Sequence, residues 1–153
     1  MSDAHLRQAL RIIDENPGRA DFVGGRDDTL IAQAERALGV EFPPSYRRFL
    51  EELGAGSFGR REFYGVIDSD RMTMPGPPNA VGSTLADRDD YGNPPELIVI
   101  GSTGFGPDYV LDTSRRDERG ECPVLVWQAG QTRDDGAERD ADSFAEHFTR
   151  RVT

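Results

Sequence analysis

The side chains that most often carry out covalent chemistry are scarce in this sequence. All 18 basic residues are arginine, so the chain has no lysine amine for a Schiff base or a phosphate-binding loop. It has two histidines, His5 and His147, and one cysteine, Cys122. A single cysteine cannot form an internal disulfide and is typical of a protein in a reducing compartment. This inventory favours binding over catalysis.

A serine with small neighbours comes closest to a catalytic motif. Residues 55–59, Ala-Gly-Ser-Phe-Gly, have the small-x-Ser-x-Gly form of a nucleophile elbow. That elbow needs a strand before the serine and a helix after it, whereas here a predicted helix precedes Ser57. The one histidine downstream, His147, lies on a predicted helix with an apolar face. We therefore interpret residues 55–59 as a glycine-rich connection from a helix to a strand, and we expect no catalytic residue.

Motifs for a cofactor or a metal are also incomplete. The glycine-rich residues 101–106 are followed by a proline and a strand-like run rather than by a helix that could receive a phosphate, so they predict a hairpin turn. The two histidines have no partners at metal-ligand spacing. Residues 68–70, Asp-Ser-Asp, lack the glycine and the final glutamate of a calcium loop. We expect no metal and no cofactor.

The charge is strongly negative, with 28 acidic residues against 18 basic ones and a net charge of −10. Nucleic-acid binding depends on basic groups that displace counterions, so this balance argues against a nucleic-acid partner, while a basic protein would be attracted. Adjacent acids in loops do not indicate the two carboxylates across a cleft that a glycosidase needs. The alternative for all of these acids is a solvated surface. We predict partner contacts at Asp68, Asp70, Asp87, Asp89, Asp90, Asp108, Asp134 and Asp135.

The length of 153 residues is that of one domain with its own core. No apolar stretch approaches the roughly 18 residues of a membrane-spanning helix, and the N-terminus has no basic segment followed by an apolar run. We therefore expect a soluble, cytoplasmic protein with no membrane partner. The oligomeric state is left open by the sequence.

Four segments repeat apolar residues every three or four positions, which predicts amphipathic helices. The first two are followed by glycine or proline signals, and the third begins with two prolines and ends at Gly54. In the last, Ser143 and Glu146 have the spacing of a capping box. The predicted helices cover about residues 6–13, 28–38, 44–53 and 143–151.

Four short runs rich in β-branched and aromatic residues predict strands, over residues 63–67, 97–100, 109–111 and 124–127. Between the first two, residues 68–79 are a predicted loop and 80–90 a predicted short helix. Trp127, which ends the last run, is expected in the core rather than at a binding surface. The order of elements predicts a single α+β domain, with a mainly antiparallel central sheet flanked by N-terminal helices and a C-terminal helix.

The segment from Ile31 to Gly59 resembles the signature of the SUKH superfamily. That signature joins an Ile-x-x-x-Glu-x-x-Leu-Gly helix, here residues 31–39, to a Leu-Pro-x-x-Tyr-x-x-Phe-Leu helix, here residues 42–50. Later pieces at 97–106, 109–112, 123–127 and 143–145 follow in the family's order. Phe42 replaces the usual leucine, and the loop over 68–79 has no counterpart in the family.

The resemblance implies a SUKH-like α+β fold over residues 1–153 without a catalytic site. Bacterial members of the superfamily are commonly immunity proteins that bind and neutralise toxin domains, often nucleases, and another branch regulates cell-wall synthesis. The expected function is a cytoplasmic immunity protein whose partner is a basic toxin domain. The alternatives are a regulatory or scaffold module of the same fold, unrelated to toxins, and a hydrolase that uses Asp and Glu.

Overall fold

The computed structural model describes residues 2–133 and 136–153 of the chain. Over these residues the helices are α1 (Ser2–Glu15), η1 (Pro17–Arg19, a 3-10 turn), α2 (Asp28–Leu38), α3 (Pro44–Glu52), α4 (Ala80–Tyr91) and α5 (Phe144–Val152). All five predicted helices are present. Their ends follow local signals: Asp27 Oδ1 accepts a hydrogen bond from the Leu30 amide at 2.8 Å, and Ser143 Oγ accepts one from the Glu146 amide at 3.1 Å.

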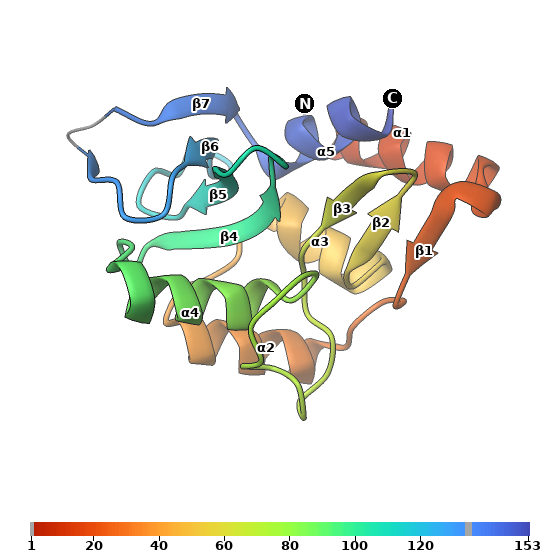
Figure 1. The fold of residues 1–153 in the computed structure, drawn as a ribbon. Coiled ribbons are helices and arrows are strands. Elements are labelled where there is room, and N and C mark those ends of the chain that lie inside the picture. Colours follow the sequence, from red (N-terminus) through yellow and green to blue (C-terminus); the bar gives the residue numbers. More distant parts are fainter. Residues whose placement is uncertain (1, 134–135) are drawn as a thin grey trace.

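The strands form two antiparallel sheets, which confirms the α+β class (Figure 1). Each sheet keeps its strands in sequence order. The first contains β1 (Ala20–Phe22), β2 (Gly56–Phe58) and β3 (Arg61–Phe63), and the second contains β4 (Leu97–Ser102), β5 (Asp108–Asp112), β6 (Val124–Trp127) and β7 (Glu138–Ala141).

The division into two sheets differs from the expected central sheet. The predicted strand over 63–67 is also displaced, because β3 ends at Phe63. Beyond it the Tyr64 amide donates to the Ile100 carbonyl at 2.9 Å, and Gly65 forms an isolated bridge with Asn79. The chain therefore leaves the first sheet and touches the second without adding a strand to it.

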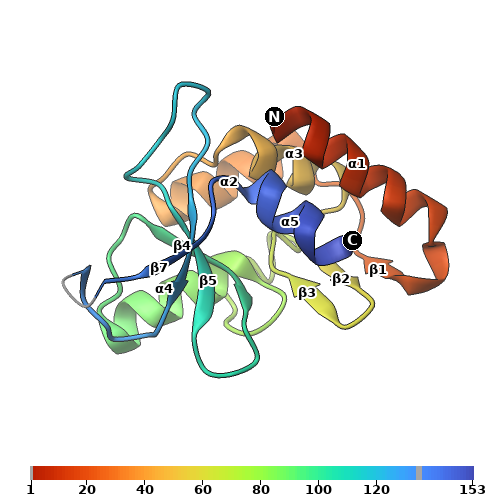
Figure 2. The ribbon, with the colours of Figure 1, turned by 90° about the horizontal axis from the view of Figure 1, so that it is seen from above.

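The helices surround the two sheets on different sides (Figure 2). Helix α4 packs along β4, while α1 and α5, from opposite ends of the chain, pack against each other. Thr149 Oγ1 donates to the His5 carbonyl at 2.7 Å and so ties α5 to α1. Both ends of the chain are thereby part of the packed structure.

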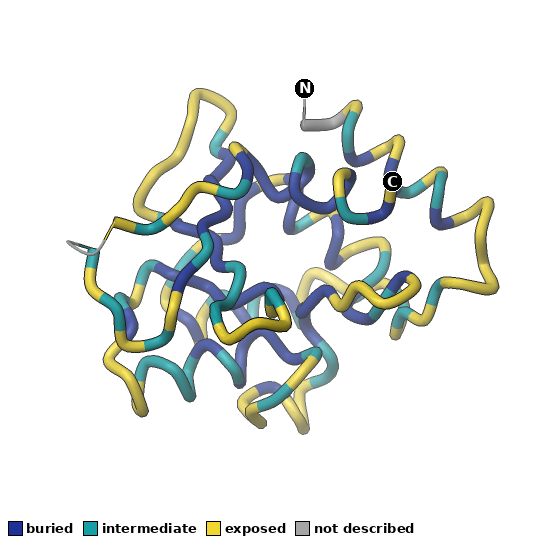
Figure 3. The backbone as a smooth tube through the Cα atoms, turned by 45° about the horizontal axis from the view of Figure 1, so that its top comes forward, coloured by how far each residue is buried: buried dark blue, intermediate teal, exposed yellow. Residues whose placement is uncertain are grey.

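The residues drawn dark blue in Figure 3 are buried, and the apolar ones divide into two clusters. Successive residues of β4 alternate between them, with Ile98 and Ile100 in the larger cluster and Leu97 and Val99 in the smaller one, so the clusters lie on opposite faces of the second sheet. In the larger cluster the Phe49 ring contacts the rings of Phe22, Tyr46, Phe63, Phe144 and Phe148, with centroids 5.1 to 6.3 Å apart. The smaller cluster includes Tyr64, Val110, Trp127 and Ala80, the first residue of α4. Trp127 is 1% exposed, which confirms its predicted place in the core.

The two glycine-rich motifs have the structural roles expected of them. Residues 101–106 belong to the β4–β5 hairpin, whose turn is closed by the Thr103 amide donating to the Pro107 carbonyl at 3.0 Å. Residues 55–59 lead from α3 into β2, with Ser57 in the middle of that strand. Ser57 pairs with Asp21 on one side and Glu62 on the other, so no helix follows it as a nucleophile elbow requires.

One side chain organises the predicted loop over 68–79. Asn79 is 3% exposed, and its Nδ2 atom donates to the carbonyls of Arg71, Met72 and Met74 at 2.6 to 3.2 Å. Its Oδ1 atom accepts from the Gly82 amide and so caps α4. The loop is therefore fixed to the start of the helix that carries three of the predicted partner-binding acids.

Candidate partner-binding surface

The structure separates the predicted site residues into groups. Asp87, Asp89 and Asp90 lie on α4, and Asp108 begins β5. Of these, Asp87 interacts electrostatically with both Asp90 and Asp108. We call these three residues the acidic cluster; Asp90 is exposed, as is its neighbour Asp89 on α4. Asp134 and Asp135 lie outside the described residues.

Asp68 and Asp70 form a separate group at the start of the loop. Asp68 accepts hydrogen bonds from the Arg71 amide at 2.8 Å and from its guanidinium at 2.7 and 3.0 Å. These hydrogen bonds hold the pKa of Asp68 below its ordinary value. Asp68 thus closes a turn with Arg71, and much of its charge is compensated within the chain. Asp70 is exposed beside this pair.

The acidic cluster is assembled by the packing of α4 on the second sheet. Side chains alternate between the faces of a strand, so Asp108 shares the α4 side of β5 with Val110 of the smaller core cluster. Thr84 Oγ1 of α4 accepts a hydrogen bond from the Val99 amide of β4 at 2.9 Å. This contact fixes the helix so that the carboxyl groups of Asp87 and Asp108 form a hydrogen bond with each other.

Burial and mutual repulsion favour the protonated form of this pair. Burial, with the adjacent Asp87 charge, raises the pKa of Asp108 to about 6. Burial and the Asp90 charge also raise the pKa of Asp87. Burial raises the pKa of Tyr64 to about 12, and the negative charges of Glu62, Asp108 and Asp87 contribute to this shift. A cation from a partner would relieve this repulsion and favour release of the shared proton.

The pair makes a specific contribution to the pH dependence of stability. Because the folded pKa of Asp108 is raised, protonation stabilises the fold below the unfolded pKa of 3.8, and this contribution is lost as the pH rises through about 6. We expect Asp108→Asn to raise the free energy of unfolding by about 1–2 kcal/mol at pH about 8, after allowance for solvent screening. Urea unfolding at pH about 8 and about 4 measures this, and a gain that is equal at both pH values would contradict the assignment.

Two exposed aromatic side chains adjoin the acids in sequence. Tyr91, 57% exposed, follows Asp90 at the end of α4, and Phe105, 92% exposed, lies in the hairpin turn before Asp108. Neither residue is among the predicted partner-binding residues. The sequence around Phe105 does predict that this side chain is exposed, since a large apolar residue between two glycines of a turn has little to pack against. Aromatic side chains are enriched where proteins bind one another.

The buried histidine, His147, has a structural role. His147 is 1% exposed, and its Nδ1 atom lies 2.7 Å from Asp140 Oδ2. The ring packs against that of Tyr109, with centroids 4.7 Å apart, and burial lowers the pKa of His147. A neutral histidine packed in this way positions α5 against the second sheet.

Another buried acid joins two helices. Glu121 is 3% exposed; its carboxylate accepts from the Ser45 amide at 3.1 Å and from Ser45 Oγ at 2.8 Å. Ser45 Oγ in turn accepts from the Ala145 amide at 3.1 Å. Glu121 therefore satisfies the N-terminus of α3 and, through Ser45, that of α5, a structural role that its type and position did not indicate.

Two negative findings apply to the described residues, 2–133 and 136–153. No helix there is long and apolar enough to cross a membrane. Nor do three or more His, Cys, Asp or Glu side chains converge there as a metal ion would require.

A known family matches nearly the whole chain. The family SUKH_5, described as SMI1-KNR4 cell-wall, matches residues 8–152. The matched range includes the signature helices α2 and α3, both sheets, and all three residues of the acidic cluster.

Proposed function

The chain belongs to the SUKH (SMI1-KNR4) family, and from this premise we propose that it is a non-catalytic immunity protein. Its proposed partner is a basic, nuclease-type bacterial toxin domain, which it binds and neutralises in the cytoplasm. Family membership supports a role in protein binding. The toxin is inferred from the chemistry of the surface and from what the family implies.

The observation that carries the proposal is the acidic cluster on α4 and β5, in which Asp87 and Asp108 are half-buried and Asp90 is exposed. Its acids stand beside the exposed side chains of Asp89 and Tyr91, in a chain with a net charge of −10. A nuclease binds its substrate through basic groups that face phosphates. A surface of carboxylates and aromatic rings can occupy those same groups, and the nucleic acid is then excluded.

The proposed mechanism needs no covalent step. The overall negative charge accelerates the encounter with a basic domain. On contact, arginine or lysine side chains of the toxin pair with Asp87, Asp90 and Asp108. Pairing replaces the carboxyl–carboxyl hydrogen bond and releases its proton, so binding weakens as the pH falls through about 6.

A second candidate function rests on the family's own description, which names the cell wall. A regulatory or scaffold module of this fold would use the same surface for a cellular partner unrelated to toxins. The two candidates differ in partner identity. Affinity capture from the source cells distinguishes them, because a basic toxin domain supports the first and a different cellular protein the second.

The charge of the α4 surface is expected to control the rate of binding. In the triple variant Asp87→Asn, Asp89→Asn, Asp90→Asn, we expect association with a toxin domain encoded directly upstream to slow by about 10- to 100-fold at low ionic strength. Salt screens such steering, so the difference should nearly vanish at about 1 M NaCl. Stopped-flow fluorescence measures both rates.

A matched variant separates local charge from net charge. Glu15→Gln, Glu51→Gln, Glu118→Gln removes the same number of charges from exposed positions on other parts of the surface. It should slow association much less than the α4 triple variant does. Equal slowing by the two variants, or a rate that does not change with salt, would refute the role of this surface.

A further inference from the structure

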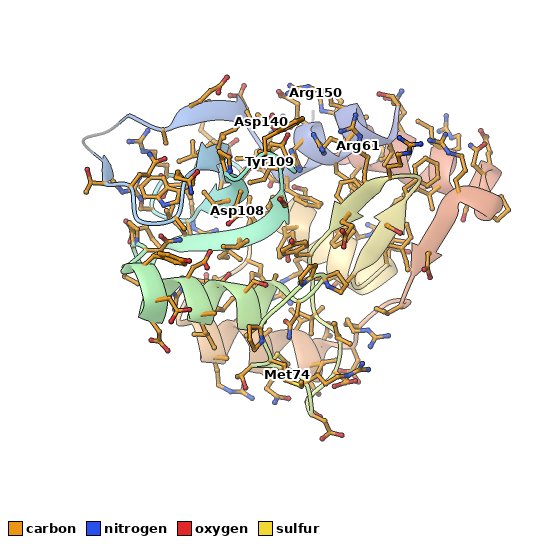
Figure 4. All side chains as sticks on the ribbon, in the orientation of Figure 1. Arg61, Met74, Asp108, Tyr109, Asp140 and Arg150 are labelled. Carbon is orange, nitrogen blue, oxygen red and sulfur yellow. The ribbon has the colours of Figure 1, made fainter. Side chains whose placement is uncertain are left out.

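Five arginines surround one hollow, although the chain is strongly acidic. The hollow has a volume of about 720 Å³ and lies between the β2–β3 turn and the end of α5, where Figure 4 shows Arg61 and Arg150 near each other. Gly59 and Val152 complete part of its wall. The five arginines are Arg19, Arg60, Arg61, Arg150 and Arg151.

Four of these guanidinium groups have no carboxylate partner among the described residues. Arg150 is ion-paired, with Glu146 at 2.7 Å and Asp140 at 3.8 Å. Arg19, Arg60, Arg61 and Arg151 form no such pair in residues 2–133 and 136–153. The chain has ten more acids than bases, so this concentration of unpaired positive charge contrasts with the charge of the chain as a whole.

Two of the four are held in place by aromatic rings. The Arg19 guanidinium lies over the Phe58 ring at 4.6 Å, and that of Arg151 lies over the Tyr109 ring at 4.6 Å. Arg151 also donates to the Tyr109 hydroxyl at 2.8 Å. Fixed guanidinium groups lose less conformational freedom on binding than free ones, which favours their use as anchors.

The positive surface is elongated. A second hollow of about 200 Å³ is lined by three of the same arginines, Arg60, Arg61 and Arg151, and by one acid, Glu62, and it extends to Ser102–Gly104 in the β4–β5 hairpin. We call the two hollows together the arginine groove. A groove that spans several elements suits an extended segment of chain better than it suits a compact ion.

We propose that the arginine groove binds a short acidic segment of a protein partner, through carboxylates that accept paired hydrogen bonds from the guanidinium groups. Planar guanidinium groups match carboxylates in this bidentate geometry. A nucleic acid carries charge along its whole length, and the acidic remainder of this surface repels it. A short Asp- and Glu-rich segment in an otherwise neutral chain avoids that repulsion.

The groove is separate from the surface proposed for the toxin. Tyr109, which supports Arg151, and Asp108 are consecutive residues of β5, so their side chains lie on opposite faces of the second sheet (Figure 4). The acidic cluster therefore lies on the Asp108 side of β5, and Arg151 lies on the Tyr109 side. The inference does not depend on the identity of the partner that binds the acidic cluster.

The test uses the intact chain and a fluorescein-labelled peptide of alternating Asp and Glu. We expect saturable binding in fluorescence anisotropy at low ionic strength, with amide NMR shifts confined to the residues around the groove, in η1, the β2–β3 turn, the β4–β5 hairpin, Tyr109 and the end of α5. Arg60→Gln, Arg61→Gln should weaken binding by about tenfold or more, since it removes two donors of charge-assisted hydrogen bonds. The matched control Arg11→Gln, Arg36→Gln removes the same charge from exposed sites outside the groove and should leave affinity within about twofold.

Three results would overturn the proposal. The first is no saturable binding of the peptide, and the second is equal weakening by the two double variants. The third is tighter binding of an oligothymidylate of matched length, with the same NMR shifts, since that would identify the groove as a phosphate site. Thermal unfolding of each variant, expected to be unchanged at these exposed positions, confirms that the comparison is between folded proteins.

Discussion

Replacing Phe49 by alanine is expected to lower the free energy of unfolding by about 3–5 kcal/mol. Phe49 is 0% exposed, and its ring contacts five other rings, which come from α3, β1, β3 and α5. Truncation removes the buried ring and leaves a cavity. The neighbouring rings belong to four different elements and cannot fill this cavity without losing contacts that they make elsewhere.

Equilibrium unfolding in urea measures this loss. The control is Phe105→Ala, which removes the same group from a side chain that is 92% exposed and should change stability by less than about 0.5 kcal/mol. A cost below about 1 kcal/mol for Phe49→Ala would show that the larger cluster is not organised around this ring.

The second large effect is expected at Arg133. Its guanidinium donates to Asp112 at 2.9 and 3.0 Å and to Glu96 at 2.7 Å. Asp112 is fully buried, and although burial opposes it, hydrogen bonding from Arg133 and Ser114 lowers the pKa of Asp112. Because Arg133→Ala leaves this buried charge with only the weaker contacts of Ser114 and Arg115, we expect a loss of about 2–4 kcal/mol.

The pH dependence identifies the mechanism of that loss. A carboxyl group with a lowered pKa in the folded state stabilises the fold above its unfolded pKa of 3.8, and this contribution is lost as the pH falls through the folded pKa. The cost of Arg133→Ala should therefore be largest near neutral pH and shrink in acid. The double variant Asp112→Asn, Arg133→Met, which removes both charges, should cost less than Arg133→Ala; an equal or larger cost at every pH would contradict a buried ion pair.

Arg133 also bears on the surface around it. It immediately precedes two of the predicted partner-binding acids, Asp134 and Asp135, and its own contacts with Asp112 and Glu96 hold Arg133 against the second sheet. If those acids contact the toxin, Arg133→Ala should reduce affinity more than its loss of stability explains. Comparing binding and unfolding of the same variant tests this.

Local signals made the helices predictable. Apolar spacing, the Asp27 and Ser143 caps and the glycine at position 39 act within a few residues of where they occur. Strands β1, β2 and β7 were missed because each has three or four residues and none contains an apolar run. These strands form because they pair with other strands. For example, β1 at residues 20–22 pairs with β2 at 56–58, which is distant in the sequence, and such a contact cannot be predicted from the residues on either side of β1.

The residue types of the candidate partner-binding surface could be predicted from the sequence, but the arrangement of its side chains could not. An acidic surface follows from composition, whereas the pairing of Asp87 with Asp108 requires the rotation of α4 and the register of β5. Asp68 has the same composition signal yet is neutralised by Arg71 three residues later. The arginine groove was not predicted, because the negative net charge of the chain gives no sign of a local positive surface. In addition, Arg19 and Arg151 are far apart in the sequence and line the same hollow only in the folded chain.

Whether this protein acts by occupying a basic toxin domain is tested by titrating that domain's nuclease activity with increasing amounts of the purified chain. We expect the activity to fall linearly to zero at an equimolar ratio. Mass spectrometry should then find the toxin intact, and the toxin should regain its activity once high salt has separated the two proteins. Undiminished activity in the presence of excess chain, or inactivation that leaves the toxin cleaved or covalently altered, would contradict this mode of action.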